Sequence, residues 1–226
     1  MTILRPTDET SAVATQGRSY RSEAEIRLRQ AVEQWGRTRW PEARVVHELV
    51  MDRGTVRADL AFVEPNHFAV CEIKSASDVS DRLMRQCSMF RLAAPELWIC
   101  AAARHASDAA LVRYLIPSIG MLVTDQDRAI GPLPEKLLLD EIAPAQRWTA
   151  HQESMLHLLW RAELGVEAQR HGLVQGGAAR MSHGKLVAAL MRLPYQDAVE
   201  SVCRQLRGRD AFWRADPPIR DNGASA

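Results

Sequence analysis

The sequence predicts an α/β protein in which a mixed β-sheet is flanked by helices and followed by a smaller all-helical unit. Helical periodicity and short strand-like runs alternate between residues 22 and 123, a pattern typical of α/β folds. Two runs are joined by Glu64-Pro65-Asn66-His67, which favours a hairpin turn. We expect a flexible arm over residues 1–19, an α/β core over 20–140, a helical unit over 141–215 and a disordered tail over 216–226.

The first expected element is a helix over residues 22–36. Leu28, Val32 and Trp35 recur at the spacing of one buried helical face. Ser22 is a suitable N-cap, and Gly36 is expected to end the helix.

The remaining elements of the expected core follow in a regular order. Strands are expected over residues 45–51, 57–63 and 68–73, then a helix over 79–94 that Ser77 or Asp78 caps. An apolar run over 97–102 predicts a buried strand, and 106–115 a helix that ends before Pro117. A strand is expected over 119–123. The helical unit comprises expected helices over 149–170, 182–192 and 195–207.

Length and composition are those of an ordinary globular protein. A chain of 226 residues can bury one sizeable core, and 46% of the residues are hydrophobic and 25% charged. No apolar run approaches the ~18 residues of a membrane span, and the amino terminus lacks the pattern of a secretory signal. The four cysteines are scattered, which predicts reduced thiols in the cytoplasm and argues against a zinc site.

The charge is distributed unevenly along the chain. The formal net charge is +1, but residues 59–144 carry an acidic excess and the segments on either side carry a basic one. Of 29 basic residues only Lys74, Lys136 and Lys185 are lysines. Because lysine and arginine are not interchangeable at a chemical site, Lys74 is of interest for its position in the motif described next.

Two acids and a lysine lie on the expected hairpin, Asp59 on its first strand and Glu72 and Lys74 on its second. Side chains alternate along a strand, so Glu72 and Lys74 share a face. A hairpin that turns at Pro65 and Asn66 places residues 59 and 72 opposite each other. The sequence therefore predicts that the two carboxylates meet, with Lys74 beside them.

Carboxylates held together in an apolar setting are costly unless something pairs them. A divalent cation would do so, since Mg²⁺ binds Asp and Glu oxygens together with phosphate oxygens and water. Such a cation lowers the pKa of a bound water and stabilises charge on a phosphate. The compact charge of Lys74 suits the orientation of that water or phosphate.

At these residues the sequence resembles the PD-(D/E)XK nuclease superfamily. The motif is Asp59…Glu72-Ile73-Lys74 on the hairpin, preceded by a helix with acids and followed by a helix with Gln86. Within the superfamily it resembles a small subfamily of uncharacterised bacterial proteins, over about residues 20–210. The resemblance implies a restriction-endonuclease-like sheet and an Mg²⁺-dependent endodeoxyribonuclease, with Mn²⁺ able to substitute.

The resemblance also implies a role for each motif residue. Asp59 and Glu72 bind the metal together with the backbone carbonyl of Ile73, and Lys74 orients or activates the attacking water. The acid of the first helix is identified as Glu25 rather than Glu23, because Glu25 lies nearer the apolar stripe. Glu48 on the first strand is a further candidate ligand, with an exposed strand acid as the equal alternative.

Gln86 falls in the middle of the apolar stripe of its helix. A polar side chain at such a position must find a partner, so either it bonds to backbone or it assists in the active cleft. The resemblance favours the second role, although Phe90 stands where many of these nucleases have a tyrosine.

Basic residues predict where nucleic acid, DNA in the first instance, would be held. The candidates are Arg57 on the hairpin and Arg180, Lys185, Arg204 and Arg207 in the helical unit. The helices have an alternative use in packing, homodimerisation or binding of a partner protein through Leu156, Leu159 and Trp160. The functional alternative is a catalytically weak or partner-dependent module that binds nucleic acid within a repair or defence assembly.

Overall fold

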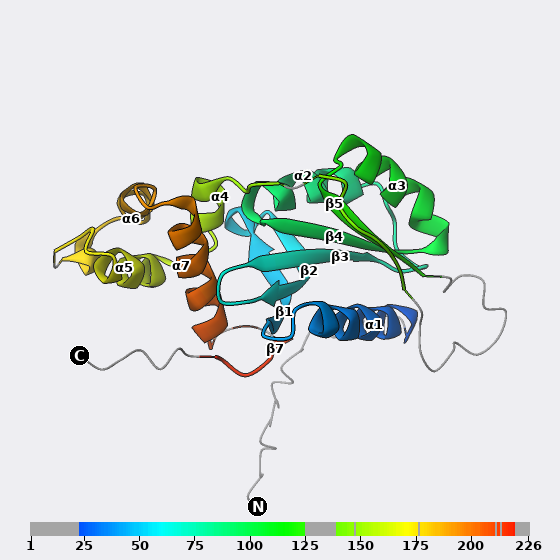
Figure 1. Cartoon of the computed structure of the whole chain (residues 1–226), viewed down its shortest axis with the longest axis horizontal. Helices are drawn as coiled ribbons and strands as arrows, with labels where there is room; N and C mark the ends of the chain where they lie inside the picture. The colour runs from blue at the N-terminus through cyan, green and yellow to red at the C-terminus, as the bar shows by residue number, and fades with distance from the viewer. Residues whose placement is uncertain are drawn as a thin grey trace, which may run out of the picture.

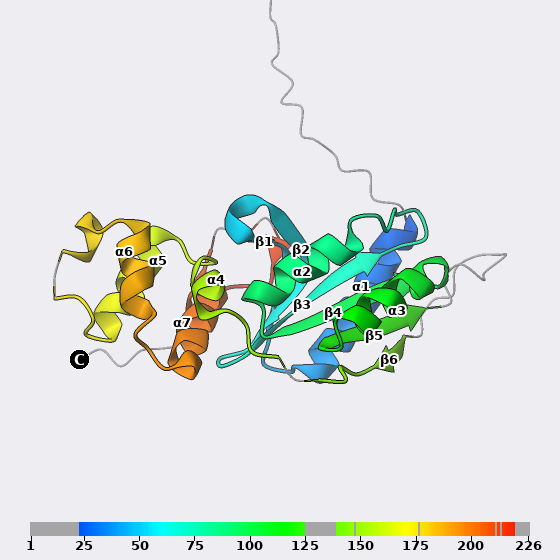
Figure 2. The ribbon, with the colours of Figure 1, turned by 90° about the horizontal axis from the view of Figure 1, so that it is seen from above.

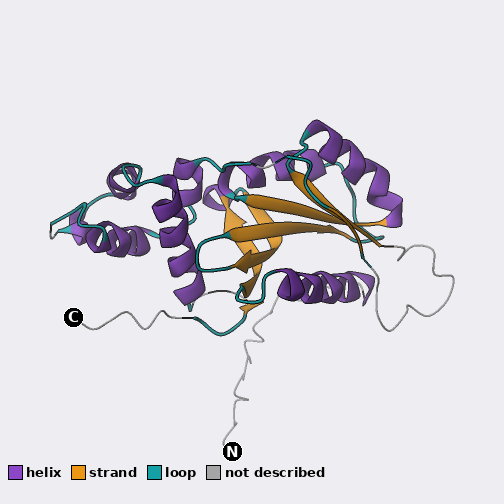
Figure 3. Cartoon of the chain, viewed as in Figure 1, coloured by secondary structure: helices purple, strands orange, loops and turns teal. Residues whose placement is uncertain are grey.

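The protein is described from a computed structural model, which defines residues 23–124, 139–146, 148–175, 177–210, 212 and 214–219. The expected arm over residues 1–19 and the residues after 219 lie outside this part of the chain, as does Lys136. Figure 1 shows a sheet with helices on both faces and a group of helices at one end. Figure 3 separates the strands from the helices by colour.

The α/β part contains three helices and most of the strands. In chain order these are α1 (Glu23–Arg39), β1 (Arg44–Met51), β2 (Val56–Val63), β3 (Phe68–Lys74), α2 (Leu83–Ala93), β4 (Glu96–Ala102), α3 (Ala106–Leu115), β5 (Ile119–Thr124) and β6 (Asp140–Ile142). The helical part comprises α4 (Gln152–Leu156), α5 (Arg161–Arg170), α6 (His183–Leu190) and α7 (Tyr195–Gly208). The described chain closes with β7 (Arg214–Ala215).

The sheet is mixed and has the strand order β6-β5-β4-β3-β2-β1-β7. Strands β1, β2 and β3 are antiparallel neighbours, whereas β3, β4 and β5 run parallel. The short strands β6 and β7 add antiparallel edges. The predicted α/β class, a mixed sheet with flanking helices and further helices after it, is confirmed.

The two faces of the sheet are covered by different helices (Figures 1 and 2). Leu28 and Val32 of α1 pack with Phe62 and Trp98 on one face, where Trp35 and Trp40 complete an aromatic cluster. On the other face α2 and α3 form a second core that continues into α4–α7. One apolar interior therefore joins the helical unit to the sheet.

The first helix is longer than expected, because Gly36 does not end it. A Cβ atom at residue 36 would lie 2.0 Å from Cε1 of Phe62. The glycine lets the helix approach the sheet at this point and continue to Arg39. The prediction that Gly36 ends the helix was therefore wrong.

Two other helices differ from their expected bounds. Asp78 Oδ2 accepts bonds of 2.7 Å from the amide and the hydroxyl of Ser75, which closes a turn after β3. Hence α2 begins only at Leu83, neither Ser77 nor Asp78 caps it, and Val79 is 68% exposed. The expected helix over 149–170 is divided into α4 and α5, and Trp160 donates its amide to Glu163 Oε2 where α5 begins.

The end of the described chain returns to the sheet. Arg44 of β1 is 1% exposed and donates to the carbonyls of Leu206, Arg207 and Arg209 at the end of α7. Asp216, expected in the tail, pairs with Arg37 of α1 at 2.7 Å. The contact holds the first residue of the expected tail against the sheet unit.

Candidate active site

The acids and the lysine of the motif lie at the carboxyl end of β3. The β2–β3 hairpin pairs Leu60 with Cys71 and Val63 with Phe68, which is the register that the sequence predicts. The ladder stops at Leu60 and Cys71, so Asp59 lies just beyond the last pair. At that point Asp59 Oδ2 accepts a 2.8 Å bond from the amide of Ile73.

Glu72 and Lys74 at the end of β3 are buried and form a polar cluster with Gln86, a half-buried residue of α2. Lys74 Nζ donates to Glu72 Oε1 at 2.9 Å and to Gln86 Oε1 at 3.1 Å. Gln86 Nε2 donates to the same Glu72 oxygen at 2.7 Å. The side chain of Gln86 therefore bonds to Lys74 and Glu72 of the motif, and its assistance in an active cleft stays a prediction.

The second oxygen of Glu72 has no hydrogen-bond partner although it is buried. Burial and, to a smaller extent, the charge of Asp59 together raise the pKa of Glu72 to about 7, although the contacts with Lys74 and Gln86 lower it. A buried carboxylate oxygen without a donor is costly. The position therefore favours a proton or a cation at Glu72 Oε2.

Arg29, a residue that the sequence analysis did not identify, gathers the other acids. Its Nη2 atom lies 2.7 Å from Asp59 Oδ1, 3.3 Å from Glu48 Oε1 and 3.6 Å from Glu25 Oε1. Its Nη1 atom donates to the Asp59 carbonyl at 2.6 Å. Three carboxylates from α1, β1 and β2 thus converge on one guanidinium that is 3% exposed.

The signal for Arg29 was present in the sequence, since it stands four residues after Glu25 and next to Leu28 of the buried stripe. Residues four apart share a helix face, so the same reasoning that selected Glu25 places Arg29 beside it. Arg29 did not stand out because nearly all of the 29 basic residues in the chain are arginines.

Both strands are distorted where these acids project. The β1–β2 ladder pairs His47 with Leu60 and Leu49 with Ala58, and Glu48 lies between these pairs with φ +58°. Leu49 and Ala58 both pack on the α2 side, whereas strict alternation along the strand would place Ala58 on the same side as Leu60. The change of face aims Glu48 and Asp59 at α1. Such backbone strain in a non-glycine residue is typical of functional sites.

Glu48 is thus a member of the acid cluster rather than an isolated, exposed strand acid. Its side chain is 10% exposed, and Arg57 Nε contacts its Oε2 atom at 2.6 Å. Arg57 is 63% exposed and lies at the outer rim of the cluster. The structure therefore brings Glu25, Glu48, Asp59 and Arg57 together around Arg29.

The sequence predicted that Asp59 and Glu72 meet on one face. The structure instead divides the motif into two linked clusters, with Asp59 held by Arg29 of α1 and Glu72 held by Lys74 and Gln86 under α2. The bond from Ile73 to Asp59 joins the two. In the described part of the chain, no three His, Cys, Asp or Glu side chains form a group that could hold a metal ion.

The basic residues of the helical unit are placed unequally. Arg180 and Lys185 are exposed. Arg204 contacts the buried Glu167 at 3.2 and 3.3 Å, and Arg207 is 8% exposed. Arg204 and Arg207 therefore contribute to the packing of the unit, and their selection as nucleic-acid contacts stays a prediction.

Leu156 and Leu159 are fully buried in the core of this chain. They are accordingly not available for an interface with another molecule. Trp160 is 50% exposed, and the guanidinium of Arg209 lies 4.3 Å from its ring centre.

The four cysteines are free thiols in the interior, and burial raises the pKa of each thiol. In the described part of the chain no helix is long and apolar enough to cross a membrane.

Comparison with protein families identifies the chain. Residues 18–221 match the family described as Bacteriophage P4 protein cII. Since the match covers most of the sequence, the chain belongs to this family. No curated protein and no solved structure shows significant similarity to it.

Proposed function

We propose that this protein is a cytoplasmic, metal-dependent nuclease that hydrolyses DNA phosphodiester bonds at the Asp59–Glu72–Lys74 site. The observation that carries the proposal is the buried, unpartnered Oε2 atom of Glu72, beside a lysine and a glutamine that fix the other oxygen. If Glu72 and Lys74 formed only a structural ion pair, we would expect both carboxylate oxygens of Glu72 to have hydrogen-bond partners.

The residue that fits a divalent cation as it stands is Glu72, and Asp59 would have to turn or share its partners to join it, because the described side chains form no ready-made group of three metal ligands. Glu72 offers the open oxygen, and Asp59, bonded to the next strand residue, is the nearest further carboxylate of the motif. The Ile73 carbonyl is the third ligand that the resemblance implies. Mg²⁺, or Mn²⁺ in its place, would supply a water of lowered pKa and neutralise charge on the phosphate.

The protein's own residues have separate tasks in this proposal. Lys74 and Gln86 hold Glu72 in one orientation, and the ammonium of Lys74 places positive charge where a phosphate oxygen gains negative charge. Arg57, exposed at the rim, is positioned to contact the DNA backbone. Arg180 and Lys185 are further candidates for phosphate contacts in the helical unit.

Arg29 supports the alternative function, a module that binds nucleic acid with little or no cleavage. Both Asp59 oxygens already have partners, one in Arg29 and one in the Ile73 amide. A metal would have to share Asp59 with Arg29 or displace it. In a binding module the arginine would remain in place and the acids would serve only to hold it.

A cleavage assay separates these functions. Labelled single-stranded, duplex and branched DNA, with RNA for comparison, is incubated with the full chain in Mg²⁺ or Mn²⁺. The nuclease proposal expects cleavage that EDTA abolishes and that Lys74→Met reduces about 100-fold or more, the range of one electrostatic catalytic group. Glu153→Gln, a change on the exposed side of α4, is the matched control and should retain full activity.

Binding measurements complete the test. Retained DNA binding by Lys74→Met without turnover supports the catalytic role of that lysine. If the unmodified chain binds DNA but cleaves none of the substrates, and titration calorimetry detects no Mn²⁺ binding, the alternative function replaces the nuclease.

A further inference from the structure

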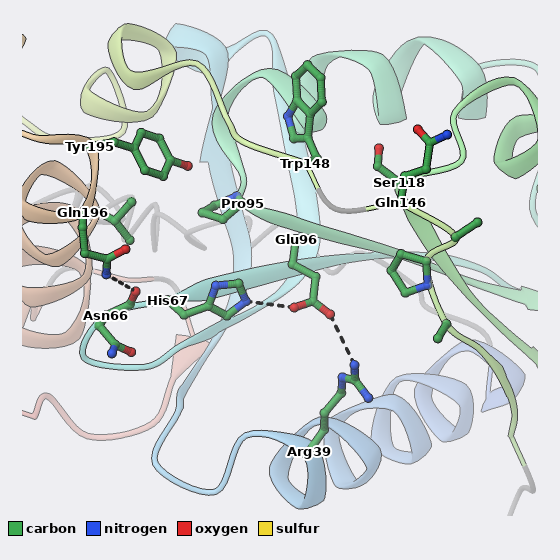
Figure 4. A pocket seen from close by; sticks show the side chains of 14 residues that line it. Arg39, Asn66, His67, Pro95, Glu96, Ser118, Gln146, Trp148, Tyr195 and Gln196 are labelled. Atoms are coloured by element: carbon green, nitrogen blue, oxygen red, sulfur yellow. Dashed lines mark hydrogen bonds and ion pairs between the residues drawn. The ribbon is translucent and has the colours of Figure 1, made fainter.

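A second site lies at the opposite end of the parallel strands. A cavity of about 830 Å³ opens at the amino ends of β3, β4 and β5, between the sheet and α7 (Figure 4). Glu72 lies five positions along the chain from His67, which borders this cavity just before β3, or roughly 17 Å at about 3.3 Å per residue. The volume is in the range of small-molecule sites, which often lie where two structural units meet.

Glu96, the first residue of β4, provides a fixed acceptor in this cavity. Trp98 Nε1 donates to its Oε1 atom at 2.6 Å, His67 Nε2 lies 2.9 Å from Oε2, and Arg39 lies 3.6 Å from Oε1. Burial raises the pKa of Glu96, but the contacts from His67 and Trp98 outweigh it and keep the pKa below its usual value. The carboxylate is therefore ionised and held in one orientation, with capacity for further hydrogen bonds.

The other walls are aromatic rings and amides. Figure 4 shows Tyr195 on one side of Glu96, Trp148 above it, and Ser118 with Gln146 on the far side. Trp148 is held in place, since its Nε1 atom donates to the Arg91 carbonyl at 2.8 Å. Flat rings offer stacking surface, and amide groups match the edges of nucleobases.

The charges in the cavity are balanced before any ligand enters. Arg39 pairs with Glu141 at 2.9 Å as well as with Glu96, and its guanidinium lies 4.8 Å from the ring centre of Trp98. A bare phosphate would meet the Glu96 carboxylate, and a simple cation would meet Arg39. A flat, neutral ligand with hydrogen-bond donors fits this surface better than either ion.

We propose that this cavity binds a nucleobase, with guanine preferred, through Glu96 and the amide of Gln146, between the rings of Trp148 and Tyr195. Guanine presents two adjacent N–H donors on one edge, which suit a single carboxylate, and acceptors on another edge, which suit an amide donor. The base belongs either to a free nucleoside or to an unpaired position of a DNA strand. The inference does not depend on the nuclease proposal, because the two sites share no residue.

Calorimetric titration in EDTA tests the proposal with nucleosides, which lack the phosphate. Guanosine is expected to bind saturably and more tightly than adenosine, cytidine or thymidine. Glu96→Gln should weaken guanosine roughly tenfold or more, the effect of losing one charge-assisted hydrogen bond. Gln146→Ala should also weaken the binding of guanosine, and it leaves every contact of Glu96 in place. This second variant therefore tests the site even if Glu96→Gln does not fold. Glu72→Gln should bind as the unmodified chain does.

Short single strands identify the source of the base. A thymine strand with one guanine, tested beside an all-thymine strand, should bind more tightly than guanosine if the site takes a base from DNA. Equal or weaker binding, with the guanine preference kept, assigns the site to a free nucleoside. The proposal is overturned if no nucleoside binds saturably, if all bind alike, or if Gln146→Ala has no effect.

Discussion

The ionisation of Glu72 makes a quantitative prediction about stability. Its pKa in the folded chain is raised from 4.5 to about 7, chiefly by burial. Between these values the folded state binds more protons than the unfolded state, so the free energy of unfolding falls as pH rises. A shift of about 2.5 units corresponds to roughly 3 kcal/mol, lost across this window and fully lost above it.

Glu72→Gln removes this titration and leaves a side chain of the same shape. Near pH 4.5 the variant and the unmodified chain should have similar stability, because a protonated glutamate resembles glutamine. Near pH 8 the variant should be more stable by roughly 3 kcal/mol. Urea unfolding followed by circular dichroism, in EDTA and at several pH values, measures the difference.

The control is Glu42→Gln, an exposed acid between α1 and β1, whose effect should not change with pH over this range. The measured quantity is the difference in the free energy of unfolding between Glu72→Gln and the unmodified chain. If this difference does not change with pH, or falls as pH rises, the account of Glu72 as a destabilised carboxylate is refuted. Added Mg²⁺ near pH 8 should raise the melting temperature of the unmodified chain and not that of Glu72→Gln, if the metal proposal is correct.

Three further substitutions test the packing. Arg29→Met should cost about 2–3 kcal/mol in urea unfolding, because it leaves partly buried carboxylates without their cation, and a second change, Asp59→Asn, should restore part of that loss. Gly36→Ala should destabilise by about 1–3 kcal/mol through overpacking, whereas Gly184→Ala, whose Cβ would meet nothing within 4 Å, should stabilise by up to ~1 kcal/mol; equal thermal shifts would contradict this. Arg44→Met should cost about 2–4 kcal/mol and make the chain after residue 206 more sensitive to limited proteolysis, and unchanged cleavage would show that other contacts hold that segment.

Much of the site was predictable because it depends on local periodicity. The turn at Pro65 and Asn66 determines the hairpin register, and the register determines the neighbours of Glu72. The spacing of Gln86 on its helix predicted that it lies in the apolar stripe and needs a partner, and because α2 packs over β3 its partners are Glu72 and Lys74.

The parts that the sequence did not predict depend on contacts between distant segments. Strict alternation along β2 would place Ala58 and Leu60 on one face of the sheet, but they lie on opposite faces. The reversal occurs beside Glu48 of the neighbouring strand, which has a positive φ angle that the sequence does not reveal. Gly36 predicts the end of a helix when only the sequence is known. Its actual role, to leave room for the ring of Phe62, depends on a contact with a distant strand. Strands β6 and β7 are too short to show a pattern of their own.

The positions of β6 and β7 have a consequence for how the protein can be divided. The helices α4–α7 lie between these strands in the chain, yet the strands border opposite edges of one sheet. Cutting before α4 would remove β7 and Arg44's carbonyl partners, leaving β1 as an open edge prone to pair with another chain. The segment that contains the helices is therefore attached to the sheet at both edges, through β6 before the helices and β7 after them. Work on separate halves of the molecule would be measuring a damaged sheet, whereas single substitutions in the whole chain keep both edges protected.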